Sequence, residues 1–158
     1  MTAPPGDSSG VRFPPPLLYF LALGAGFALE RRWPIAIVAG HPRGFLAAGV
    51  ALAALGLGLA FSGVVAFRRA GTSPNPTRPT NALTAAGPYR FTRNPMYLGL
   101  AIASAGVAVA CDALWPLLLV PVAAALMVPL VIVREERYLE EKFGDAYRRY
   151  RSSVRRWI

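Results

Sequence analysis

The sequence has 158 residues, 54% of them hydrophobic, and its mean hydropathy of +0.41 is too high for a soluble domain of this size with a polar surface. The composition therefore predicts an integral membrane protein. The net charge of +9 then indicates membrane orientation rather than binding to nucleic acid. The single cysteine, Cys111, excludes an internal disulfide, and no metal-ligand pattern is present.

Four apolar segments predict an all-α fold, a polytopic membrane helix bundle that forms a single domain. The predicted crossings are residues 13–33, 44–68, 95–111 and 113–137, with a flexible N-terminus at 1–12, a cytoplasmic loop at 69–94 and a cytoplasmic amphipathic tail at 138–158. The second and fourth crossings contain long uncharged runs, each sufficient for about 30 Å of hydrocarbon. The first and third are shorter. A cleaved secretory signal is the alternative for the first, but Glu30-Arg31-Arg32-Trp33-Pro34 is a poor cleavage site.

Only Asp112 separates the third and fourth segments, so they are expected to form a tight hairpin in which Asp112 caps the following helix. Small residues at spacings of three and four predict close helix packing along the third segment, at Gly99, Ala103, Gly106 and Ala110. Gly58 and Ser62 predict a second stripe of this kind. Three prolines predict bends that leave space for a pocket in the fourth segment, at Pro116, Pro121 and Pro129.

The distribution of basic residues predicts that both termini are cytoplasmic. With this orientation, 14 of the 17 lysines and arginines lie on the cytoplasmic side and 3 on the other. The loop at 69–94 and the tail at 138–158 then share one face of the membrane. The large excess of arginine over lysine is typical of a high-GC bacterium, which predicts location in a bacterial inner membrane.

Two adjacent acids, Glu135 and Glu136, continue directly from the fourth segment. They are either a solvated helix end paired with local arginines, or a site where one carboxylate binds a ligand and the other orients an arginine. The tail beyond them is amphipathic, with apolar residues at helical spacing among arginines. It is expected to break at Gly144, with Asp145 capping the second piece. Such a tail either anchors on the membrane surface or covers a site there.

Several motifs follow one another in the C-terminal half. They are Leu83-Thr84-Ala85-Ala86-Gly87-Pro88-Tyr89, Arg93-Asn94-Pro95-Met96-Tyr97, Glu135-Glu136, Leu139, Phe143-Gly144, Tyr147 and Tyr150. Each is weak alone, but the ordered set resembles the isoprenylcysteine carboxyl methyltransferase and phospholipid methyltransferase-like integral membrane enzymes.

The resemblance implies an enzyme that uses S-adenosylmethionine, without a Rossmann glycine motif, to methylate a lipophilic small molecule or lipid-modified acceptor in the bilayer. It implies that the cofactor is bound by Asn81, Ala82, Leu83, Thr84, Tyr89, Asn94, Pro95, Met96, Tyr97 and Glu135. Leu83 and Tyr97 suit an adenine face, and Glu135 suits the amino group or the ribose hydroxyls.

The expected reaction is a direct in-line displacement in which the enzyme mainly aligns the reactants. Arg93 or Arg134 is expected to hold an anionic acceptor, and Glu136 is expected to act as base for a neutral one. Eukaryotic members of the family carry histidine where this chain has Asn94. Because asparagine takes no proton near neutral pH, Asn94 is predicted to position the cofactor.

Two other functions remain open from the sequence. The first is a sterol-reductase-like activity with NADPH, since those enzymes resemble this family in their C-terminal half, although they have more crossings. The second is a non-enzymatic four-helix transporter or assembly protein. Retention of labelled S-adenosylmethionine rather than NADPH by the protein in detergent distinguishes a methyltransferase from the reductase. Proton-coupled efflux without methyl transfer would support the transporter.

Overall fold

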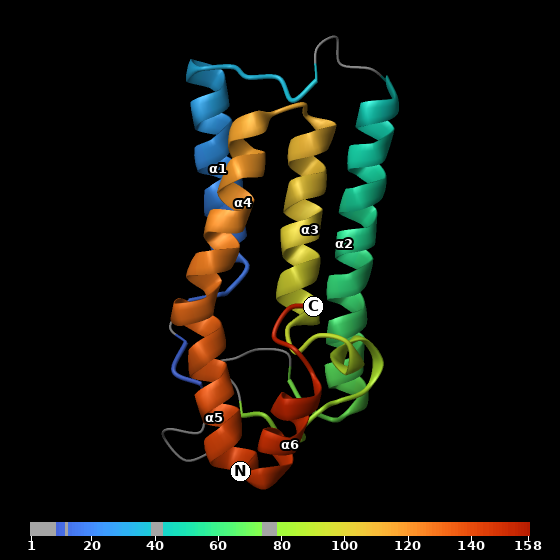
Figure 1. The fold of residues 1–158 in the computed structure, drawn as a ribbon, viewed down its shortest axis with the longest axis vertical. Coiled ribbons are helices and arrows are strands. Elements are labelled where there is room, and N and C mark those ends of the chain that lie inside the picture. The colour runs from blue at the N-terminus through green and yellow to red at the C-terminus, as the bar shows by residue number, and fades with distance from the viewer. Residues whose placement is uncertain (1–8, 12, 39–42, 74–78) are drawn as a thin grey trace.

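A computed structural model describes residues 9–11, 13–38, 43–73 and 79–158, and these contain helices but no strand. Four helices run side by side, up and down in turn (Figure 1): α1 (Leu17–Arg32), α2 (Arg43–Arg69), α3 (Pro95–Ala110) and α4 (Leu114–Met127). At one end are the 3₁₀ helix η1 (Gly87–Arg90), the π-helical turn η2 (Val128–Ile132), α5 (Val133–Phe143) and α6 (Asp145–Ser153). Most of the predicted flexible N-terminus, residues 1–8 and 12, lies outside the described residues.

Among the described residues, two helical stretches are long and apolar enough to cross a membrane, Gly44–Arg69 and Leu114–Phe143. The second consists of α4, η2 and α5 in one continuous helix. The helices α1 and α3 have 16 residues each, or about 24 Å at 1.5 Å per residue. Large apolar side chains such as Phe20, Leu55 and Phe61 are exposed on the outside of the bundle, as expected for a surface in contact with lipid. The predicted helical membrane bundle is confirmed.

The most extensive contact between helices of the bundle lies between α2 and α3. The small residues of α3 pack closely, as predicted, and the structure shows that their partner is α2, because a Cβ added at Gly106 would lie 2.3 Å from the backbone nitrogen of Ala53. The predicted second stripe was wrong: Gly58 is exposed with nothing within 4 Å. Gly56, two residues earlier, faces α3 instead. The small residues in the sequence predicted a packing stripe on α2, but the position of α3 determines which side of α2 forms this stripe.

At the end of the bundle away from α5 and α6, two acids hold the connections together. Asp112 does not cap α4, because the helix begins after Ala113 with no side-chain cap. The Oδ1 atom of Asp112 instead accepts from the backbone N–H groups of Ile37 and Val38, at 2.9 and 3.0 Å. The backbone N–H of Trp115, in the first turn of α4, donates to Glu30 at 3.2 Å. Glu30, near the end of α1, therefore accepts from a backbone N–H group at the start of α4. This is the role that was predicted for Asp112.

The amphipathic tail folds beneath the bundle in two helices (Figure 1). The predicted break at Gly144 is confirmed, since its φ of 52° separates α5 from α6. The predicted cap at Asp145 was wrong: Gly144 occupies the N-cap, and Asp145 lies in the first turn, where it pairs with Arg148 at 2.6 Å. The apolar side of this tail packs on the protein. Tyr147 and Tyr150 are buried together with Tyr89.

Candidate functional site

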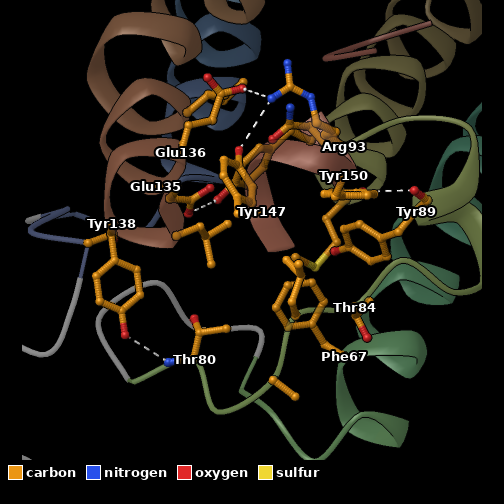
Figure 2. Close-up of a pocket in the computed structure, with 18 of the residues that line it drawn as sticks. Phe67, Thr80, Thr84, Tyr89, Arg93, Glu135, Glu136, Tyr138, Tyr147 and Tyr150 are labelled. Carbon is orange, nitrogen blue, oxygen red and sulfur yellow. Dashed lines mark hydrogen bonds and ion pairs between the residues drawn. The ribbon is translucent and has the colours of Figure 1, made fainter. Parts of the chain in front are cut away.

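A pocket lies at the α5 and α6 end of the bundle, between segments that are far apart in the sequence (Figure 2). Its walls come from the end of α2, the loop after residue 79, the first turn of α3, η2 with α5, and α6. The space between its lining atoms is about 810 Å³, counted out to where the pocket opens to solvent. The turn that leads into α3 and the acids that follow α4 meet in this pocket, as expected if residues of both bind one cofactor.

The π-helical turn positions the acids. Pro129 has no N–H to donate, and the helix widens there, so that the backbone N–H of Val133 reaches the carbonyl of Val128, five residues back. The helix then resumes as α5 and brings Glu135 to the first turn of α3, where the hydroxyl of Tyr97 donates to its Oε1 atom at 2.6 Å. Tyr97 is only 6% exposed. This bond joins α3 to α5 inside the pocket.

Glu136 is the centre of an ion cluster beside Glu135. Arg93 contacts its Oε1 atom at 3.0 Å, and Arg156 binds both oxygens, at 3.0 and 2.7 Å. The Glu136 side chain is 11% exposed and that of Arg93 is 10% exposed, so the pair is largely shielded from water. Arg93 also donates to the hydroxyl of Tyr147 at 3.4 Å. Because both carboxylate oxygens accept from guanidinium groups, the geometry does not support the predicted role of Glu136 as a base.

Aromatic side chains cover the other side of the pocket (Figure 2). The rings of Phe67 and Tyr89 lie 5.0 Å apart between centroids, and the Tyr150 hydroxyl donates to the Tyr89 carbonyl at 2.9 Å. Burial raises the pKa of the phenols of Tyr89, Tyr147 and Tyr150 above the ordinary value, so these hydroxyls keep their protons and can donate at neutral pH. Within the described residues, the buried Tyr89 hydroxyl and the Nε atom of Arg93 have no hydrogen-bond partner.

Most of the residues predicted for the site line this pocket. Those that do are Ala82, Leu83, Thr84, Tyr89, Arg93, Asn94, Met96, Tyr97, Glu135 and Glu136. Asn81 does not, and its backbone N–H donates to Thr72 at 2.8 Å. Pro95 is fully buried beside the pocket at the start of α3. Arg134 is exposed, and its guanidinium donates to the carbonyl of Gly10 at 3.4 Å, so it does not share the pocket with Glu135.

Several lining residues were not among the predicted site residues. They are Ser9, Phe67, Ser73, Thr80, Ile132, Tyr138, Leu139, Tyr147 and Tyr150. The amphipathic spacing of the tail includes Leu139, Tyr147 and Tyr150, and the structure shows that these three residues line the pocket. The sequence does not indicate that Phe67 belongs to a site, because this residue ends an apolar run that predicts only a membrane crossing. The position of Tyr138 depends on a distant segment, because the backbone N–H of Thr80 donates to the Tyr138 hydroxyl at 3.1 Å.

Comparison with known families identifies the chain. The model of one family, phospholipid methyltransferase, matches residues 45–146, which contain every lining segment except Ser9 and Tyr147 to Tyr150. The chain belongs to the phospholipid methyltransferase family. The methyltransferases of this family generally use S-adenosylmethionine.

Other comparisons add little to the family assignment. An uncharacterized protein of Haemophilus influenzae is 70% identical over 27 residues, which are 17% of this chain and 43% of that protein. The chain thus spans less than half the length of this relative. No solved structure matches the chain.

Proposed function

We propose that the pocket binds S-adenosylmethionine and that the protein transfers its methyl group to a lipophilic acceptor, such as a lipid amine or thiol or an isoprenylcysteine-like carboxylate. The observation that carries the proposal is the hydrogen bond between Tyr97 and Glu135, which closes one pocket between α3 and α5. The loop and tail that form the pocket carry most of the basic residues. By the positive-inside rule, the proposed site faces the cytoplasm of a bacterial inner membrane.

The residues present fit this cofactor. An adenine ring needs apolar or aromatic walls, which Leu83 and the Phe67–Tyr89 pair supply. The cofactor's amino group or ribose hydroxyls need an acceptor, and Tyr97 occupies only one oxygen of Glu135 among the described residues. The carboxylate of the cofactor needs a hydrogen-bond donor. The buried Nε atom of Arg93 and the buried hydroxyl of Tyr89 have no hydrogen-bond partner among the described residues. A buried donor without a partner is costly, so these two atoms favour a polar ligand in the pocket.

S-adenosylmethionine supplies a methyl group on a positively charged sulfur. The chain's own contribution is alignment and exclusion of water. Tyr147 and Tyr150 from α6 cover the pocket, and their burial with Tyr89 limits solvent access. Glu136 holds Arg93 in place at the pocket wall, where the guanidinium can face an anionic group. We assign Glu136 this positioning role instead of the role of a base.

Calorimetric titration of the purified protein in detergent tests the proposal. S-adenosylmethionine is expected to bind and NADPH is not, and Glu135→Gln should weaken the binding at least tenfold because the carboxylate charge is lost. Glu141→Gln is the matched control, since it removes the same charge from an exposed position of the same helix, outside this pocket. Absence of binding to the native protein, or equal affinity for both variants, contradicts the proposed site. Transfer of labelled methyl groups into extracted lipid then identifies the acceptor class.

A further inference from the structure

The last residues of the sequence return from α6 to the turn that leads into α3. We call residues 154–158 the return segment; Figure 1 shows it rising from α6 to the base of α3. Its carbonyl groups accept three hydrogen bonds from the turn. The backbone N–H of Arg93 donates to Arg155 at 2.9 Å, while the Thr92 hydroxyl and the Asn94 amide donate to the carbonyl of Arg156 at 3.1 and 2.9 Å.

Arg156 also reaches the acidic helix. Its guanidinium holds Glu136 with two bonds, at 3.0 and 2.7 Å, in the planar two-pronged geometry that arginine forms with carboxylates. This hydrogen bonding to Glu136 raises the pKa of Arg156 above its usual value. One residue therefore binds the α3 turn through its carbonyl group and α5 through its side chain.

We propose that Arg156 is a positioning residue for the cofactor pocket, an inference that rests on the proposed function. Arg156 does not line that pocket, but two of its partners, Asn94 and Glu136, do. The first turn of α3 and the start of α5 both line the pocket, and the Tyr97–Glu135 bond joins them at another point. A second tie through Arg156 holds the walls at a fixed separation before the ligand arrives, and such preorganisation improves affinity.

The charge of Arg156 has a second consequence for the pocket. Glu136 is shared by two arginines, so the cluster of these three side chains carries one net positive charge. Arg156 lies further from the pocket and is more exposed, with 34% of its side chain accessible against 10% for Arg93. With Arg156 present, Glu136 does not fully neutralise Arg93. The guanidinium of Arg93 thereby remains an effective partner for an anionic group of the ligand.

The test compares three variants of the full chain: Arg156→Ala, Arg156→Lys and Arg155→Ala. Arg155→Ala is the matched control, because it removes the same charge from the neighbouring position, its side chain is exposed, and its carbonyl group is kept. Two quantities are measured after thermal denaturation has shown that each variant is folded. They are the dissociation constant of S-adenosylmethionine, and the hydrogen-exchange rate of the Arg93 amide in the ligand-free protein.

We expect Arg156→Ala to raise the dissociation constant about tenfold, and the KM for the cofactor similarly, with kcat changed less than threefold. Arg156→Lys should recover part of the affinity, since it keeps the charge but loses the two-pronged geometry. Amide exchange at Arg93 should accelerate in Arg156→Ala and not in Arg155→Ala.

If Arg156→Ala accelerates amide exchange at Arg93 but leaves the affinity for S-adenosylmethionine unchanged, the link through Arg156 stabilises the structure without positioning the pocket. If amide exchange at Arg93 is unchanged, Arg156 does not hold the α3 turn. Either result overturns the inference. Failure of the native protein to bind S-adenosylmethionine overturns the proposed function itself, and is distinguished by the native control.

Discussion

The packing of α2 against α3 makes a strong prediction about a single methyl group. In Gly56→Ala, the new Cβ would lie 2.3 Å from the backbone nitrogen of Ala103 and 2.6 Å from the carbonyl oxygen of Gly99. Ordinary van der Waals contact begins at 3.4 Å, so the helices must separate by about 1 Å. A gap of this size forfeits roughly a quarter to a half of each dispersion contact along the stripe. We expect the free energy of unfolding to fall by about 2–3 kcal/mol.

Gly58→Ala is the matched control, because it adds the same methyl group to the same helix at a position with nothing within 4 Å. It should leave the stability unchanged or raise it by up to about 1 kcal/mol through helix propensity. Thermal denaturation in detergent, followed by circular dichroism, measures both. Gly56→Ala should lower the Tm by roughly 4–12 °C. Equal Tm values for the two variants would refute the placement of Gly56 against α3.

Three further predictions concern single side chains. Tyr97→Phe removes the 2.6 Å bond to Glu135 and should lower the free energy of unfolding by about 1–3 kcal/mol, measured by thermal denaturation; an unchanged Tm contradicts this. Tyr89→Phe should leave the ligand-free protein as stable as before, because the hydroxyl has no partner among the described residues, and weaken S-adenosylmethionine binding about two- to tenfold in calorimetry. Asp112→Ala should lower the Tm without changing cofactor affinity, whereas Asp112→Asn, which keeps an acceptor oxygen and tolerates the φ of 51°, should stay near the native value.

Much of the helical framework is predictable because it depends on local physical properties. The long uncharged runs of α2 and α4 identify crossings, since hydrocarbon excludes charge over about 30 Å. Pro95 predicts the start of α3, where its missing N–H is not needed. Gly144 predicts the break between α5 and α6. Each of these signals lies in a residue and its immediate neighbours along the chain.

Two of the wrong predictions, the cap at Asp112 and the stripe at Gly58, share one physical cause. An acid beside a helix start was expected to cap that helix, but the N–H of Trp115 in α4 binds Glu30, 85 residues earlier, while Asp112 holds a loop about 75 residues away. In the same way, Gly58 was expected to pack and Gly56 does. A side chain bonds to whichever group lies nearest in space, and spacing along one helix does not identify that group.

The candidate site combines both kinds of information. The chain's motifs named most of the lining residues through family resemblance, and hydrophobic patterning placed them at the ends of helices on one face of the membrane. The tertiary arrangement assigned their partners: Tyr97 to Glu135, and Glu136 to both Arg93 and Arg156. Hydropathy and periodicity reflect whether water, lipid or protein surrounds a segment, and they can be recognised within the sequence of that segment alone. Ion pairs and hydrogen bonds depend on distances of about 3 Å, which exist only after the helices have packed.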